Sequence, residues 1–322
     1  MGTSESPELK LIEPESLPLG ERKTFEYVAL SYPWGDPVKH PHADFETTTK
    51  NVQSYMNKIE AKLPDTLNDA IRVCRAIGKR YLWIDSLCII QGPDGDFTQE
   101  AGRMGTVFSS AYCVLATTSA DGSHSGFLNR TSRREIGQPP EYEVVSFPYM
   151  GKDGNQIDTI YIEESFDNFQ ADVREGRLNQ RGWVYQERAL ARRTIHFTNN
   201  QTYWECGRGI RCETLTKMKN SYESFPGDAN FPWYGLHHQK GGDIAFYESL
   251  YEQYSLLSFT HLEDRPVAIA GLEQRLISAL QQKGGAKHGC YGIFGQYWGR
   301  GLLWQRAYGA GLHIINVIVI SL

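Results

Sequence analysis

Several features that mark common protein classes are missing from this sequence. Its net charge is -5, with 33 Lys and Arg against 38 Asp and Glu, so no general electrostatic attraction favours nucleic acid. Residues 1–8 are polar and acidic and lack the apolar stretch of a secretory signal. No apolar run is long enough to span a membrane. We therefore expect no nucleic-acid partner and no membrane span.

Cysteine is scarce and scattered through apolar segments, at Cys74, Cys88, Cys113, Cys206, Cys212 and Cys290. Without a secretory signal, this distribution favours reduced thiols and a cytoplasmic location over disulfides. The spacing of Cys206 and Cys212 matches no standard zinc pattern, so we expect no metal.

Three well-known catalytic loops are also absent. There is no Gly-x-x-x-x-Gly-Lys-Ser/Thr phosphate loop, no Gly-x-Gly-x-x-Gly after a strand and no Gly-x-Ser-x-Gly elbow. We therefore expect no required cofactor. What the chain does have is the profile of a soluble globular protein, 40% hydrophobic and 22% charged. Seven Trp and eighteen Tyr predict a large aromatic core, an aromatic-lined pocket, or both.

Strand-like and helix-like segments alternate in the first 130 residues. Apolar runs at 25–32, 81–84 and 112–118 predict buried strands, and helical spacing predicts helices over 65–76 and 97–110. This β-α-β-α-β order is typical of an α/β fold with an open parallel sheet.

After residue 140 the pattern changes to alternating strands and turns. We expect hairpins at 142–147 with 159–162 and at 194–197 with 201–205, a short helix within 178–190, and helices at 246–257 and 265–280. Residues 217–242 are expected to form a loop. The apolar tail 312–322 is either a buried strand or a chain end that is not native.

Polar side chains follow each of the three predicted parallel strands: Ser31, Trp34, Gly35, Asp85, Ser86, Cys88 and Ser119. Carboxyl ends of parallel strands meet at one edge of a sheet, where ligands bind, so these residues are expected to gather there. Each has a structural alternative. Asp85 faces a ligand or caps the following backbone, Cys88 is a nucleophile or a small core residue, and Trp34 stacks on a ring or closes the core.

A further polar group follows near residue 181. Arg181 is suited to binding a phosphate or carboxylate, or to locking the second layer by pairing with Glu187 or a core acid. Trp183 and Gln186 are candidate ligand-binding residues beside it.

Four ordered blocks resemble the fungal heterokaryon-incompatibility (HET) domain family: Tyr27–Gly35, Leu63–Ile71, Trp83–Cys88, and Arg181–Leu190 followed by Thr202–Cys206. Pro33 departs from the family pattern without changing the assignment. The resemblance implies a factor of self/non-self recognition and programmed cell death. It divides the chain into a polar arm (1–24), a HET domain (25–215, with its α/β core at about 25–130) and a helical, loop-rich extension (216–322) packed on that domain.

HET domains look like distant relatives of Toll/interleukin-1 receptor (TIR) domains, which implies a TIR-like or flavodoxin-like core. Some TIR domains cleave NAD with a helical glutamate, and Glu100 is the residue that matches it here, beside Asp85 and Cys88 as catalytic candidates. NAD would then be a substrate. The alternatives are an enzyme acting on another small metabolite and a non-catalytic assembly module. The implied partners are a second copy or another incompatibility protein, or a small-molecule ligand.

Overall fold

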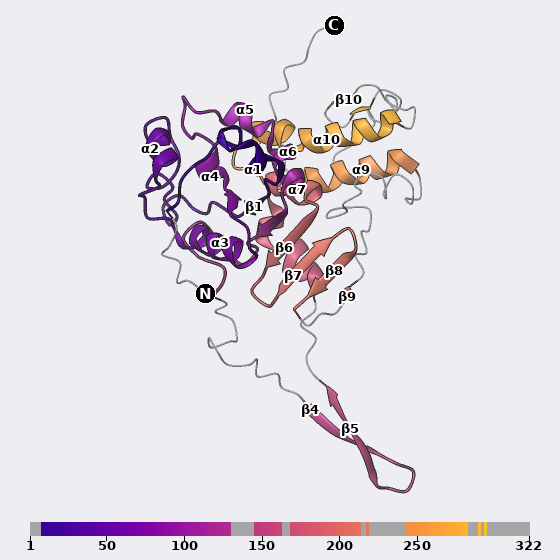
Figure 1. Cartoon of the computed structure of the whole chain (residues 1–322). Helices are drawn as coiled ribbons and strands as arrows, with labels where there is room; N and C mark the ends of the chain where they lie inside the picture. Colours follow the sequence, from indigo (N-terminus) through magenta and orange to yellow (C-terminus); the bar gives the residue numbers. More distant parts are fainter. Residues whose placement is uncertain are drawn as a thin grey trace.

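The computed structural model describes residues 8–129, 145–162, 168–213, 217–218, 242–282, 289–290 and 293–294. Its central element is a mixed seven-stranded sheet with the order β2-β1-β3-β6-β7-β8-β9 (Figure 1). The first four strands are parallel: β2 (Tyr81–Trp83), β1 (Tyr27–Ser31), β3 (Cys113–Ala116) and β6 (Arg193–Phe197). The last three are antiparallel: β7 (Thr202–Cys206), β8 (Gly209–Cys212) and β9 (Lys217–Met218).

Strands β1 and β3 lie inside the parallel part of the sheet and are buried along almost their whole length. Buried parallel strands need apolar residues on both faces, which explains the continuous runs Val28–Leu30 and Cys113–Ala116. The expectation that β2 is equally buried was wrong. It is an edge strand with one neighbour, and Tyr81, Leu82 and Trp83 are all partly exposed.

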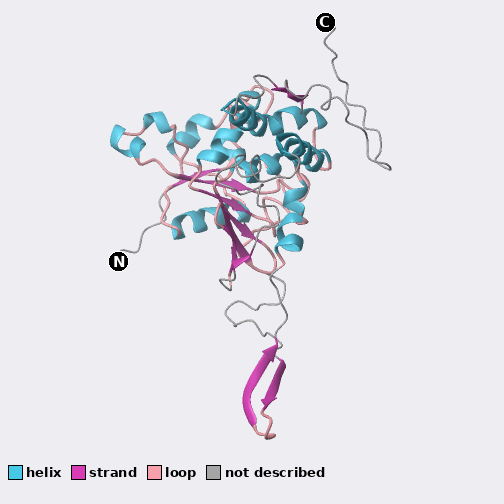
Figure 2. Cartoon of the chain, turned by 90° about the vertical axis from the view of Figure 1, so that its right-hand side faces the viewer, coloured by secondary structure: helices cyan, strands magenta, loops and turns pink. Residues whose placement is uncertain are grey.

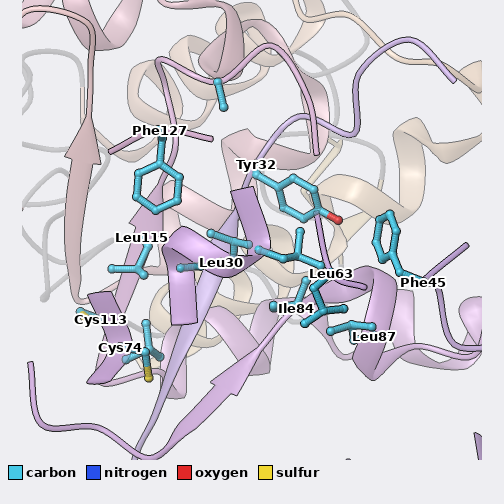
Figure 3. Packing of buried hydrophobic residues seen from close by; sticks show 14 of the residues in the cluster. Leu30, Tyr32, Phe45, Leu63, Cys74, Ile84, Leu87, Cys113, Leu115 and Phe127 are labelled. Carbon is cyan, nitrogen blue, oxygen red and sulfur yellow. The ribbon is translucent and has the colours of Figure 1, made fainter. Parts of the chain in front are cut away.

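Helices cover both faces of the sheet (Figure 2). On one face, α3 (Asp65–Ala76) packs Leu67, Ala70 and Cys74 against side chains of β1 and β3 such as Leu30 and Leu115. Figure 3 shows this cluster, which Phe45, Leu87 and Phe127 extend toward the carboxyl ends of the strands. The alternate residues of the same strands face the other way and pack against α6.

On the opposite face, α6 (Met104–Ser110) packs against β1 and β3. Beside it lie α5 (Phe97–Ala101), α7 (Gly182–Leu190) and α10 (Arg265–Gln282), and α9 (Gly242–Ser255) packs against α7 and α10. The single helix expected over 97–110 is therefore two helices, separated at Gly102 and Arg103. Glycine is a poor helix former, so it suits the break. Gly105 of α6 and Gly271 of α10 touch directly, since a Cβ on Gly105 would lie 3.0 Å from the Gly271 Cα.

The remaining elements are short: η1 (Pro14–Ser16), α1 (Leu19–Lys23), α2 (Val52–Asn57), α4 (Asp85–Cys88), η2 (Gln170–Arg174), η3 (Arg177–Gln180), η4 (Leu262–Asp264), β10 (Gly289–Cys290) and β11 (Ile293–Phe294). The amino-terminal arm is tied down from Leu9, because the backbones of Leu9 and Leu11 bond to Ile59 and Tyr55.

The predicted hairpin near residue 150 is present as β4 (Val145–Met150) and β5 (Gln156–Ile162). Figures 1 and 2 show it extending away from the central sheet. Its Phe147, Tyr149 and Ile160 side chains are about half exposed. The predicted hairpin of β6 and β7 is also confirmed, as are the helices at 246–257 and 265–280.

Among the described residues, no helix combines the length and apolar character that a membrane crossing requires. Most of the expected loop 217–242 and the whole tail 312–322 lie outside the described residues, as does Tyr142 at the start of the first predicted hairpin.

Candidate functional site

The carboxyl ends of β1 and β2 bring four polar side chains together, three of which, Trp34, Asp85 and Ser86, the sequence places at this edge. Tyr32, directly after β1, donates its hydroxyl to Ser86 Oγ at 2.8 Å. Trp34 Nε1 donates to Asp85 Oδ2 at 2.7 Å, and the Ser86 amide donates to Asp85 Oδ1 at 2.7 Å. Asp85 therefore binds the Ser86 amide in the first turn of α4 and orients the indole of Trp34. We call this edge of the sheet, together with Arg181 and Glu187 described next, the rim site.

Helix α7 adds an arginine and a second carboxyl. Arg181, just before the helix, donates from Nη1 to the Tyr32 carbonyl at 2.9 Å. Glu187, one and a half turns into α7, is buried beside Ser31 of β1. The Ser31 hydroxyl favours the ionised form of Glu187, although it makes no hydrogen bond of ordinary geometry among the described residues.

Burial dominates the electrostatics of both acids. Desolvation raises the pKa of Asp85, while the hydrogen bonds from Trp34 and Ser86 and the charge of Arg181 act in the opposite direction. Desolvation raises the pKa of Glu187 to about 7; Ser31 and Arg181 lower it and the Asp85 charge raises it. The rim site thus holds two interacting carboxyls, one of which changes its protonation near neutral pH.

The loops after β1 and β3 touch each other above the rim. Gly35 has φ of +88°, a left-handed conformation that suits glycine, and a Cβ there would lie 2.9 Å from the Gly122 Cα. The His40 ring packs over both glycines, 2.6 Å from the Cβ position of Gly35. The loops approach this closely because neither glycine carries a side chain.

A histidine cluster adjoins Trp34. His42 Nε2 lies 3.1 Å from the Trp34 carbonyl oxygen and 3.2 Å from Ser123 Oγ, while Ser123 Oγ lies 2.9 Å from His124 Nδ1. Burial lowers the pKa of His42, and the neighbouring histidines lower it further. Ser123 is fully buried, so the cluster fixes the loops and leaves no exposed nucleophile.

Further hydroxyls line the carboxyl end of β3. Thr117, Thr118 and Ser119 each have a buried side-chain oxygen that finds no hydrogen-bond partner in the described part of the chain, as does Ser31. Buried polar atoms without partners are rare because each costs about 1–3 kcal/mol. Unpaired polar atoms therefore accompany the two carboxyls at this end of the sheet.

Comparison with protein families matches the chain to the model of the Heterokaryon incompatibility protein (HET) family. It covers residues 27–187, half of the chain, from β1 into α7. The chain belongs to the HET family. No curated protein and no solved structure matches it. The HET match contains every residue of the rim site.

Two other catalytic candidates in the HET domain have different surroundings. Burial raises the pKa of the Cys88 thiol to about 11, the direction opposite to that of a nucleophilic cysteine, and its sulfur accepts the Ile84 amide at 3.4 Å. These observations favour the packing interpretation of Cys88. Glu100 lies on α5 and pairs with Arg103 at 2.8 Å. No described contact joins Glu100 to Asp85 or Glu187.

Two candidates near Arg181 face away from the rim site. Trp183 Nε1 donates to Asp264 Oδ2 at 3.1 Å, and Gln186 Oε1 accepts the Gly271 amide at 2.7 Å. Both side chains hold the carboxyl-terminal extension against α7.

The sequence interpretation named Glu187 as a pairing partner of Arg181, without a role at the site, and did not include Tyr32 or His42. The signal for Tyr32 was its place next to Ser31 at the end of a buried strand. For Glu187 it was the spacing from Arg181, six positions and under two helical turns away. In the described residues, no group of three or more His, Cys, Asp or Glu is arranged to hold a metal ion.

Proposed function

We propose that this HET domain serves fungal self/non-self recognition by cleaving NAD at the rim site, and that loss of the cofactor leads to cell death. The observation that carries the proposal is the pair of buried carboxyls, Asp85 and Glu187, placed with Arg181 at the carboxyl edge of a parallel sheet. Carboxyl groups with shifted pKa values at such an edge are typical of functional sites.

The strand order supports a TIR-like or flavodoxin-like core. The order β2-β1-β3-β6 follows the first four positions of the flavodoxin-like order, in which the order of the strands reverses between the first and the third strand. Ligands of such folds bind at this reversal, outside the carboxyl ends of the strands. Ser31, Tyr32 and Thr117 lie at that place in this sheet.

The proposed reaction needs a carboxylate and a proton acceptor. Water attacks C1′ of the ribose, the bond from C1′ to the nicotinamide nitrogen breaks with its electrons going to nitrogen, and the water proton passes to a carboxylate. Asp85 accepts two hydrogen bonds that favour its ionised form, so it is suited to stabilise the positive charge that develops on the ribose. Glu187, with a pKa near 7, is suited to accept the proton.

The test is NAD consumption by the purified chain over a range of protein concentrations. We expect turnover that falls at least a hundredfold in Glu187→Gln and Asp85→Asn, the loss typical of a general acid-base group. Glu26→Gln is the matched control, because Glu26 precedes β1 at the opposite end of the sheet and pairs with Lys79. Glu100→Gln decides whether the glutamate on α5 also takes part.

Three results would separate this proposal from its alternatives. Loss of turnover in Glu100→Gln alone would place the catalytic glutamate on α5. Absence of turnover at every concentration would exclude NAD, and a screen of small metabolites against wild type and Asp85→Asn would follow. Concentration-dependent assembly without any turnover would favour a non-catalytic signalling module.

A further inference from the structure

The backbone around Arg181 is held by a segment outside the HET match. The Ser258 amide donates to the Gln180 carbonyl at 2.8 Å, and the Gly182 amide donates to the Ser258 carbonyl at 2.9 Å. These two bonds bracket Arg181 as a short parallel bridge. Ser258 belongs to residues 256–264, which join α9 to α10 and which we call the strap.

Side chains of the strap reinforce the bridge. The Phe259 ring lies against Gly182 so closely that a Cβ on Gly182 would overlap it. Tyr254 and Arg265, from the helices on either side of the strap, contact this ring in turn. At the end of the strap, Asp264 accepts the hydrogen bond from Trp183. The start of α7 is therefore fixed by the strap at three consecutive residues, Arg181 to Trp183.

Arg181 connects the strap to the rim site. Its backbone is held by Ser258, while its guanidinium bonds to Tyr32, whose hydroxyl bonds to Ser86. The charged and polar groups that act on Glu187 are Arg181 before α7, Asp85 after β2, and Ser31 on β1. Displacement of Arg181 would leave the two carboxyls without the cation that offsets their repulsion.

We propose that the strap is a positioning element of the rim site, which holds Arg181 beside Asp85 and Glu187. The proposal rests on the rim site being the functional site. The outer side of the strap faces solvent, since Leu256 is 74% exposed and Ser258 is exposed.

The experiment follows the titration of the Glu187 carboxyl by ¹³C NMR in the full chain, with its resonance assigned as the one missing from Glu187→Gln. We expect Arg181→Gln to move the midpoint upward by on the order of one pH unit, the effect of losing a nearby cation. Phe259→Ala is expected to move it in the same direction. Hydrogen exchange of the Gly182 amide should also become faster in Phe259→Ala.

Phe97→Ala is the matched control. Phe97 also packs an aromatic ring against α7, at Trp183, but makes no ring contact or hydrogen bond with the strap among the described residues. It should leave the Glu187 midpoint unchanged. Phe259→Leu replaces Phe259→Ala if the smaller side chain prevents folding.

An unchanged midpoint in Phe259→Ala, together with a shifted one in Arg181→Gln, would overturn the strap proposal. An unchanged midpoint in Arg181→Gln would overturn it at its first step. Neither readout requires turnover, so a chain inert toward NAD would reject the proposed reaction and leave this test valid.

Discussion

The buried ion pair between α7 and β7 allows a prediction of stability. Arg188 Nε and Nη2 donate to the two carboxyl oxygens of Glu205, each at 3.0 Å, and His196 Nε2 lies 2.9 Å from Glu205 Oε2. The three side chains are 8%, 1% and 0% exposed. Burial lowers the pKa of His196, so at neutral pH it is uncharged and donates from Nε2. The network ties the helix of the rim site to the sheet.

The pKa of Glu205 gives the magnitude. Burial alone would raise it, but the charge of Arg188 and the hydrogen bond from His196 lower it from 4.5 to about 2. A pKa depression of this size corresponds to about 3 kcal/mol of stabilisation of the folded state by ionised Glu205. Removal of one partner from a buried pair costs about 3–5 kcal/mol, because the other charge stays buried. We therefore expect Arg188→Met to lower the free energy of unfolding by about 3–5 kcal/mol at pH 7.

The assay is urea unfolding followed by tryptophan fluorescence, for Arg188→Met, Glu205→Leu and the double variant. The double variant should recover most of the loss, because apolar residues of similar volume often replace a buried pair at little cost. Since the folded pKa of Glu205 is depressed, its contribution is present above pH 4.5 and falls as the pH approaches 2. The penalty of Arg188→Met should therefore shrink over that window.

Arg177→Met is the control, because its pair with Asp121 is exposed and is expected to contribute less than about 1 kcal/mol. The reasoning would be refuted by an equally small effect of Arg188→Met. It would also be refuted by a double variant that loses the sum of the two single losses.

Three further predictions concern single features. The folded pKa of Glu187 is raised from 4.5 to about 7, so the free energy of unfolding of the wild type should fall by about 3 kcal/mol as the pH rises from 4.5 to 7. Urea unfolding of Glu187→Gln over the same pH range should show a smaller fall. Cys88, with a pKa of about 11, should resist iodoacetamide until the chain unfolds, as mass spectrometry of the labelled peptide would show; fast native labelling would contradict this. Replacement of the half-exposed Phe147 and Ile160 by Ser should reduce concentration-dependent light scattering, and unchanged scattering would exclude the β4–β5 hairpin as an association surface.

Much of the fold follows from local pattern. The runs at Val28–Leu30 and Cys113–Ala116 predict buried strands because both faces of a parallel sheet need apolar side chains. The local pattern could not show which strands pair with one another in the sheet. The segment Arg193–Phe197 alternates like any hairpin strand, and nothing local indicates that it pairs in parallel with β3 and extends the parallel sheet. Similarly, the apolar character of Tyr81–Trp83 does not show that β2 lies at an edge.

The rim-site residues that directly follow strands were predictable from the sequence, whereas the residue supplied by helix α7 was less so. Asp85, Ser86 and Trp34 come together because the carboxyl ends of β1 and β2 are neighbours. The place of Glu187 depends on packing between α7 and β1, which are about 150 residues apart in sequence. Neighbouring residues of a helix point in different directions, so Gln186 faces α10 while Glu187 faces the sheet.

Because the side chains of α7 face different neighbours, substitutions on this one helix can change the rim site or the stability of the fold separately. In α7 and its first flanking residue, Arg181 and Glu187 face the rim site, Trp183 and Gln186 bind the extension, and Arg188 bonds to Glu205. Glu187→Gln should therefore change the rim site and leave the ion pair intact, whereas Arg188→Met should weaken the fold and leave both rim carboxyls in place. A Glu187→Gln variant that unfolds as readily as Arg188→Met would show that α7 is primarily a packing element, and the rim carboxyls would then be a consequence of the fold.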